Sequence, residues 1–299
     1  MSKPAIGFIG LGLMGDAMVQ RLQAQGYALN VMANRSRANV DAAIARGATE
    51  FKTARELAEA SDIVMLCMDT SASVEARMRG ADGVIAGLSA GNTVIDFGTS
   101  LPASTRTLGE EVAAAGAHHM DAPLGRTPAH AVDGLLNIMG AGDKAVFDRV
   151  KPVLDDLGEN VFHLGPLGAG HTVKLINNFF GMTVANSMAE AFAMADLAGV
   201  ERQTVYDVMA AGPLHSGMMD FVKGYAVDGD PAQLAFAIKN ASKDIGYYAT
   251  MADDANAPSL MVQGAKQALA TAVDQGRGED MVSQMTDFFA DMFAAQKKS

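Results

Sequence analysis

Two halves of the chain differ in how apolar and polar residues alternate. In the first half, short apolar runs alternate with amphipathic stretches that end at glycine, a common feature of helix C-termini. The apolar runs predict buried strands at residues 5–10, 28–33, 62–68, 93–98, 117–123, 135–142 and 160–165. Strands that alternate with helices indicate crossover connections and one mainly parallel sheet that is covered on both faces. The first half is therefore predicted to be an α/β domain.

The second half begins with a long apolar stretch that contains no proline, starting near Gly168. An average globular helix has only about 11–12 residues, so we expect a long connecting helix over about 168–197. Lys174 and other polar residues interrupt the stretch, which argues against a membrane span. The rest is rich in alanine and methionine and predicts no strand. We therefore expect a domain of residues 1–165 and an all-α domain of residues 166–299.

Composition excludes several classes of function. The formal net charge of -11 argues against nucleic acid or an anionic membrane as the main partner, because both favour a basic surface. Cys67 is the only cysteine, so the chain can form neither an internal disulfide nor a cysteine zinc cluster. The histidines lack the cysteine or carboxylate spacing of a metal site, and none is predicted. Without a signal-peptide pattern or a long apolar run, we expect a cytoplasmic protein.

The stretch "GFIGLGLMG" places Gly10, Gly12 and Gly15 between a predicted strand and a predicted helix. In this G-x-G-x-x-G pattern the first glycine permits a tight turn, and the second lets a pyrophosphate approach the backbone. The third allows the helix to pack closely on the strand. Free N–H groups at the helix N-terminus would then bind the phosphates. The pattern predicts a Rossmann-type dinucleotide-binding domain, and the alternative is a glycine-rich turn in a flavodoxin-like fold.

The choice of dinucleotide depends on the end of the second strand, where the chain reads Asn34, Arg35 and Ser36. NAD-specific sites usually present an acidic residue there to the ribose hydroxyls. An arginine and a hydroxyl would instead hold a 2′-phosphate. This favours NADP(H) over NAD(H), although both stay open, because Arg35 can also begin the next helix and face water.

Lys174 and Asn178 are four residues apart on the predicted long helix and therefore share one face. A lysine in an apolar helix is costly to bury, and its pKa falls readily when it is desolvated. Such a group suits proton transfer near neutral pH. His171 lies one turn earlier and is expected on the helix surface, with a place in the cleft as the alternative.

Four motifs in order give the chain a resemblance to β-hydroxyacid dehydrogenases of the 3-hydroxyisobutyrate dehydrogenase family, over essentially its whole length. They are "GFIGLGLMG", "DAPLGRTPAHAVDGLL", "GHTVKLINN" and "FAIKNASKDI". The resemblance implies that Lys174 is the catalytic acid/base and that Asn178, or less favourably Asn177, orients the substrate. It also implies that cofactor contacts come from the glycine turn and from Leu13, Met14, Met68, Thr99 and Lys243. Met68 and Asp69 stand where the family usually has Pro-Asn.

The second motif departs from the family pattern at Gly125, Arg126 and Thr127, where Ser-Gly-Gly is usual. The guanidinium of Arg126 can bind a carboxylate or sulfonate through two hydrogen bonds, so we expect these residues to bind the substrate. The G-R-T loop resembles that of the sulfolactaldehyde reductase branch. The alternatives are that Arg126 points to solvent or binds a cofactor phosphate.

Together these features imply an NAD(P)-dependent oxidoreductase that interconverts a small 3-hydroxy acid or hydroxy sulfonate and its semialdehyde by hydride transfer. The resemblance also implies a homodimer or homotetramer formed through the helical domain. An imine reductase shares the architecture but generally lacks the lysine. A non-catalytic cofactor-binding regulator would not need Lys174 and Asn178.

Overall fold

The computed structural model describes residues 3–33 and 37–296, without the side chain of the last of these. The chain divides into two compact units, Met1–Lys174 and Leu175–Ser299. Helix α9 (Ala169–Ala198) begins in the first unit and continues into the second. Its bounds agree closely with the long helix expected from the sequence, over about residues 168–197.

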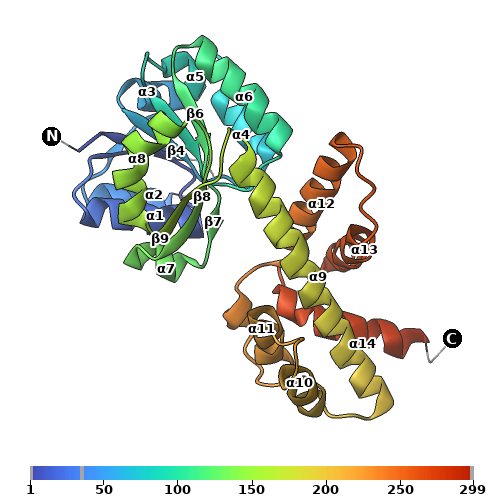
Figure 1. The fold of residues 1–299 in the computed structure, drawn as a ribbon. Coiled ribbons are helices and arrows are strands. Elements are labelled where there is room, and N and C mark those ends of the chain that lie inside the picture. Colours follow the sequence, from blue (N-terminus) through green and yellow to red (C-terminus); the bar gives the residue numbers. More distant parts are fainter. Residues whose placement is uncertain (1–2, 34–36, 297–299) are drawn as a thin grey trace. The chain divides into compact units, whose positions relative to one another are not determined.

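In the part of the chain that is described, the first unit contains a six-stranded parallel sheet (Figure 1). Its strands, in spatial order, are β3 (Thr49–Glu50), β2 (Leu29–Val31), β1 (Ile6–Ile9), β4 (Ile63–Leu66), β5 (Thr93–Asp96) and β6 (His118–Asp121). The strand order reverses between β1 and β4, as it does in doubly wound dinucleotide-binding folds.

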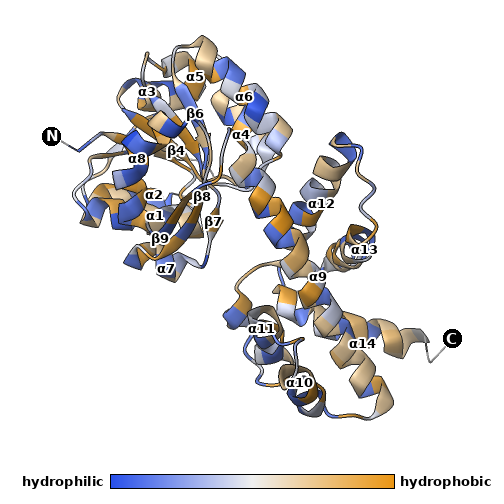
Figure 2. Ribbon diagram, viewed as in Figure 1, coloured by the Kyte–Doolittle hydropathy of each residue, from blue (hydrophilic) through white to orange (hydrophobic). Residues whose placement is uncertain are grey.

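Helices cover both faces of this sheet. The helices described in the first unit before α9 are α1 (Leu13–Ala24), α2 (Ala38–Ala45), α3 (Ala54–Glu59), α4 (Ser71–Met78), α5 (Val84–Gly87), α6 (Pro102–Ala114), α7 (Pro128–Asp133) and α8 (Lys144–Leu157). Because side chains alternate along a strand, Phe8 joins the core under α1 and α8, and Ile9 joins a second core under α3 and α6. The apolar strands are orange in Figure 2. Burial on both faces explains why the central strands β1 and β4 contain no polar side chain.

The last two predicted strands do not extend the parallel sheet. They form a separate sheet of β7 (Leu124–Gly125), β8 (Leu136–Gly140) and β9 (Gly158–His163), in which β7 and β8 are antiparallel. The expectation of one sheet was therefore wrong at this point. The reason is the connection after β6, because the chain continues into β7, turns through the short helix α7 and returns as β8, antiparallel to β7.

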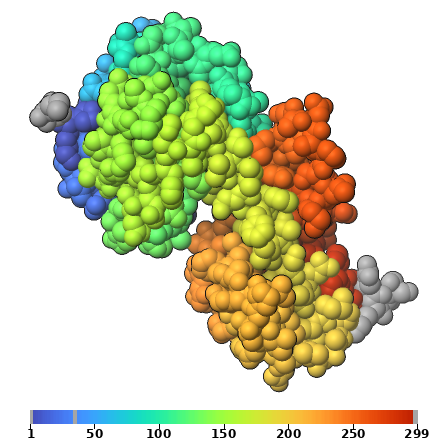
Figure 3. Space-filling model, viewed as in Figure 1, coloured from blue at the N-terminus to red at the C-terminus, as the bar shows by residue number. Residues whose placement is uncertain are grey.

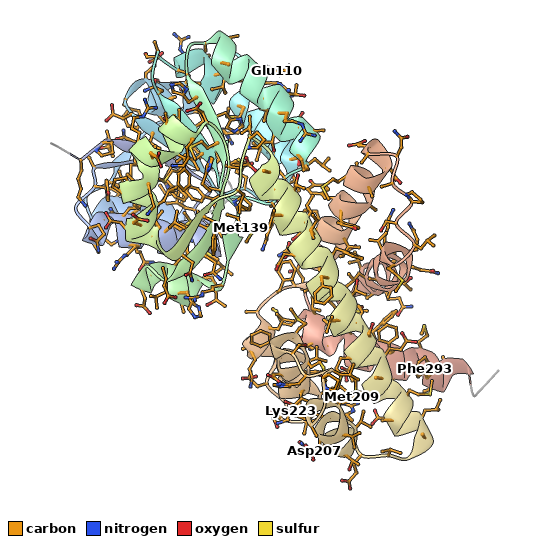
Figure 4. All side chains as sticks on the ribbon, viewed as in Figure 1. Glu110, Met139, Asp207, Met209, Lys223 and Phe293 are labelled. Atoms are coloured by element: carbon orange, nitrogen blue, oxygen red, sulfur yellow. The ribbon has the colours of Figure 1, made fainter. Side chains whose placement is uncertain are left out.

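The described residues of the second unit form helices joined by loops, and none of them belongs to a strand. Around α9 lie α10 (Arg202–Ala210), α11 (Gly217–Ala226), α12 (Ile238–Asp254), α13 (Val262–Ala272) and α14 (Met285–Gln296). Its core includes Met188 and Phe192 of α9, with Met209 and Phe293, labelled in Figure 4, packed against it. Figure 3 shows α10 and α11 in orange beside the yellow end of α9. None of the described helices is long and apolar enough to cross a membrane.

Candidate functional site

Four strands of the large sheet end in register. Their last residues pair across the sheet in the order Ile9, Leu66, Asp96 and Asp121. Because the strands are parallel, the segments that follow them meet at one edge of the sheet. This edge therefore carries the glycine turn after β1, Met68 after β4 and Thr99 after β5. Ligands of doubly wound folds bind outside this carboxyl edge, next to the point where the strand order reverses.

The three glycines of the turn meet three different steric demands. Gly10 has φ +99°, and a Cβ there would lie 2.3 Å from the carbonyl oxygen of Cys67. At Gly15 a Cβ would lie 2.0 Å from the carbonyl oxygen of Gly10, so helix α1 packs directly on the turn. At Gly12 a Cβ would have no atom within 4 Å among the described residues. The backbone is therefore open at Gly12, where a pyrophosphate would have to approach.

The start of α1 is suited to an anion. The first N–H groups of any helix lack partners inside it, and Gly12, the N-cap residue, has no side chain to cap them. Leu13 is 84% exposed, whereas Met14 packs against the core. The amide of Asn39 donates to the Leu11 carbonyl over 2.8 Å and so fixes the turn from α2. These residues fit the phosphates of a dinucleotide.

The residues expected to select the dinucleotide, Asn34, Arg35 and Ser36, lie outside the described residues. The next arginine, Arg37, pairs with Asp41 over 2.8 Å and with Glu50 over 2.9 Å. Its guanidinium is thus engaged with two carboxylates of the protein.

The G-R-T loop begins at Gly125, the last residue of β7, and has an unusual backbone conformation at its second residue. Arg126 has φ +78°, a conformation that favours glycine, and glycine is the residue usual in the family pattern at this position. Its Nη1 atom donates to the Leu135 carbonyl over 2.6 Å and lies 2.5 Å from Glu159 Oε2. The Thr127 hydroxyl lies 2.7 Å from His130 Nδ1. Both side chains expected to bind a substrate anion therefore have protein partners.

Helix α9 carries the expected catalytic pair. Lys174 is half-buried, Asn177 is exposed, and Asn178 is buried. Asn178 Nδ2 donates to Asp244 Oδ2 over 2.6 Å, and Lys243 Nζ lies 3.0 Å from Asp244 Oδ1. Asp244 was not among the expected site residues. The sequence indicated Asp244 through its position next to Lys243 in the motif "FAIKNASKDI". Its carboxylate accepts a hydrogen bond from the Asn178 amide and so holds that amide in one orientation.

His171 was expected on the helix surface, and that expectation was wrong. Its side chain is fully buried, because the first turn of α9 packs against the edge of the sheet. Its Nε2 lies 3.7 Å from Asp96 Oδ2, and its Nδ1 lies 3.8 Å from Asp121 Oδ2. The Thr105 hydroxyl lies 2.8 Å from the same Nδ1.

Two further ionisable groups of this region are buried. Burial raises the pKa of the Asp121 carboxyl, against the opposing effect of His171 and of three backbone N–H groups, those of Gly168, His171 and Asp121 itself. Burial also lowers the pKa of His119, its neighbour on β6, to about 4. The described residues contain no group of three or more potential ligands that could hold a metal ion.

Fold and glycine turn together define a Rossmann-type dinucleotide-binding protein with a helical second unit. Residues 5–165 match the family described as the NAD binding domain of 6-phosphogluconate dehydrogenase. Residues 168–289 match the family described as the NAD-binding domain of NADP-dependent 3-hydroxyisobutyrate dehydrogenase. The chain thus belongs to the β-hydroxyacid dehydrogenase family, which includes the 3-hydroxyisobutyrate dehydrogenases.

Individual relatives agree with this assignment. The chain is 32% identical over 292 residues to 2-(hydroxymethyl)glutarate dehydrogenase of Eubacterium barkeri, covering 96% of this chain and 95% of the relative. It is 33% identical over 215 residues to 2-hydroxy-3-oxopropionate reductase of Escherichia coli, covering 72% and 73%. A solved 3-hydroxyisobutyrate dehydrogenase of Mycobacterium tuberculosis with L-serine has the same fold. Its TM-score is 0.86 at 24% identity, with 96% and 99% of the two chains covered.

The glycine turn predicts opposite outcomes for two alanine substitutions. Gly15→Ala should destabilise the fold by about 1–3 kcal/mol, because its Cβ would overlap the Gly10 carbonyl. Gly12→Ala should cost about 1 kcal/mol or less but weaken dinucleotide binding about 10-fold or more, because its Cβ would stand where the phosphates approach. Thermal unfolding and a cofactor titration measure the two effects. Unchanged cofactor affinity in Gly12→Ala would contradict this assignment of the turn.

Burial of neutral His119 predicts a pH dependence of stability. The unfolded chain takes up a proton near pH 6.5, whereas the folded protein excludes it until about pH 4. Stability from this group is therefore complete above pH 6.5 and is lost as the pH falls towards 4. His119→Phe should reduce that loss by up to about 1.4 kcal/mol per pH unit. Denaturant unfolding of both proteins from pH 7 to 4 measures the difference, and identical slopes would refute it.

Proposed function

We propose that the protein is an NAD(P)-dependent oxidoreductase that interconverts a small anionic 3-hydroxy acid, or hydroxy sulfonate, and its semialdehyde. One observation carries this proposal beyond family membership. A half-buried lysine, Lys174, lies one turn from a buried asparagine, Asn178, whose amide is fixed by Asp244. A cofactor-binding protein without turnover has no evident need for this pair.

In the reductive direction, a bound nicotinamide dinucleotide would supply the hydride that adds to the aldehyde carbon. Lys174 Nζ would donate a proton to the aldehyde oxygen and recover it from solvent. Asn178 would hydrogen-bond to the substrate and hold the reacting carbonyl in place, with exposed Asn177 as the less favoured alternative. General acid catalysis of this kind contributes roughly 10²–10⁴-fold.

Cofactor binding is assigned to the carboxyl edge of the large sheet. Its phosphates would lie on the open backbone at Gly12 and the first N–H groups of α1. Leu13, Met14, Met68 and Thr99 would line the cofactor, and Lys243 is proposed as a further cofactor contact. Arg35, with Asn34 and Ser36, would favour NADP(H) over NAD(H).

Substrate specificity is assigned to Gly125, Arg126 and Thr127. A substrate carboxylate or sulfonate would compete with Glu159 for the guanidinium of Arg126, which now contacts that carboxylate. Binding of the substrate anion would then replace one charged partner with another, so the arginine remains paired in both states. For the assembly we propose a homodimer or homotetramer formed through the second unit.

A direct test is an activity panel in which NADPH or NADH is combined with short aldehydes that bear a carboxylate, a sulfonate or no charge. We expect oxidation of the cofactor with at least one anionic aldehyde and a preference for NADPH. Activity on imines alone would support an imine reductase. Cofactor binding without turnover on any carbonyl or imine compound would support a regulator.

Substitution of Lys174 tests the mechanism. Lys174→Ala should lower kcat at least about 10²-fold, because the proton donor is lost, while cofactor affinity stays within about threefold. Lys151→Ala is the matched control, because Lys151 is a half-buried lysine of α8 that pairs with Asp155, and its kcat should stay within about twofold. Steady-state kinetics and cofactor titration give both values, and ordinary turnover in Lys174→Ala would refute the assignment.

Two substitutions should shift substrate affinity in opposite directions. Arg126→Gly removes the guanidinium and also relieves the positive φ, so the protein should fold while KM for anionic aldehydes rises about 10-fold or more. Glu159→Gln removes the competing carboxylate and should lower the same KM. An uncharged aldehyde is the control and should respond to neither change. Unchanged KM for every acid in Arg126→Gly would rule out this anion site.

A further inference from the structure

The start of α9 lacks a cap from its own sequence. Helix N-termini are usually capped by a Ser, Thr, Asp or Asn side chain, but here the preceding residue is Gly168, with φ +91°. The cap comes instead from the end of β6. Asp121 Oδ1 accepts from the Gly168 N–H, and Asp121 Oδ2 accepts from the His171 N–H, each over 2.7 Å.

Close backbone contact strengthens this junction. A Cβ at Gly170 would lie 2.3 Å from the Met139 carbonyl oxygen and 2.8 Å from Asp121 Oδ2. Only glycine therefore lets the first turn of α9 come this close to β8 and β6. Figure 4 labels Met139 on β8.

The side chain of His171 also fixes this first turn of α9, through contacts that the Asp121 cap does not make. It lies between two buried carboxylates, those of Asp96 and Asp121, and its Nδ1 also meets the Thr105 hydroxyl. The hydroxyl of Thr105 also lies 3.2 Å from the Leu101 carbonyl oxygen, so it contacts both this backbone group and the imidazole. Asp96 is in turn fixed by the Gly98 N–H over 2.8 Å and the Ser100 hydroxyl over 2.9 Å.

Lys174 follows His171 by three residues, so both lie on one side of the helix. The ends of β5 and β6 therefore determine the position and the rotation of the turn that presents Lys174. We propose that Asp121 and His171 are positioning residues for Lys174, joined to the sheet edge through Asp96 and Thr105. This inference rests on the proposed role of Lys174 as the proton donor.

Asp121→Asn tests this positioning role most directly. It keeps the shape and one acceptor oxygen, but its NH₂ group would face one of the two backbone N–H donors and break that hydrogen bond. We expect kcat to fall about 10–10²-fold, because a small misplacement of a catalytic group has effects of this size. KM for the aldehyde and Kd for the cofactor should stay within about threefold. The matched control is Asp143→Asn, which alters an aspartate cap on the Ala145 and Val146 N–H groups at the start of α8 and should keep kcat within about twofold.

A double-mutant cycle separates positioning from general damage to the fold. If Asp121 acts through Lys174, then Asp121→Asn/Lys174→Ala should be no slower than Lys174→Ala alone, within about twofold. Multiplied losses in the double variant would overturn the proposal, because Asp121 would then act independently. Normal kcat in Asp121→Asn, with Lys174→Ala impaired, would also overturn it and leave the proposed function intact.

Full activity in Lys174→Ala would refute the proposed function, and the positioning role with it, whatever Asp121→Asn does. If Asp121→Asn does not fold, Thr105→Val provides the same cycle. This substitution conserves shape and removes the hydroxyl that meets His171 Nδ1. We then expect Thr105→Val to lower kcat about 10–10²-fold and to leave KM within about threefold. The double variant with Lys174→Ala should again be no slower than Lys174→Ala alone. Any other pattern overturns the proposal.

Discussion

The carboxylate of Asp121 joins the sheet of the first unit to the helix that continues into the second. A fully buried carboxylate is costly unless its charge is compensated. Here two backbone N–H groups at the start of α9, the positive end of the α9 dipole and the nearby imidazole of His171 offset part of that cost. Because these groups belong to the first turn of α9, the contact also determines where that helix begins. The position of Lys174, and of the residues that follow it on α9, therefore depends on where the helix begins.

The sheet edge provides the second constraint. Ile9, Leu66, Asp96 and Asp121 end their strands in register, so the glycine turn and the cap of α9 belong to the same edge. At Gly12, in the glycine turn, no described atom lies near the position of a Cβ. At Gly170, at the start of α9, neighbouring atoms leave no room for a Cβ. The same edge of the first unit thus carries an open stretch of backbone at the glycine turn and a closely packed start of helix α9.

Much of this architecture could be predicted from the sequence. Apolar periodicity located the long helix and every strand of the large sheet except the short, exposed edge strand β3. The spacing of Gly10, Gly12 and Gly15 indicated the turn, because each of these features depends on neighbours within a few residues. The Rossmann-type fold class and the family were confirmed. The assignments of individual site residues stay predictions.

What the sequence did not reveal depends on contacts between distant segments. Nothing near His171 indicates that Asp96 and Asp121, from two different strands, enclose it. The partnership of Asn178 with Asp244 spans 66 residues, and the positive φ of Arg126 depends on the path of the chain after β7. Local patterns carry no information about such pairings.

The central claim is that Asp121 holds the start of α9, and amide hydrogen exchange tests it most directly. The Gly168 and His171 amides should exchange slowly in the unmodified protein. In Asp121→Asn their protection should fall at least about 10-fold, while the Ala145 and Val146 amides at the start of α8 keep theirs. Equal protection of Gly168 and His171 in the two proteins would contradict the account.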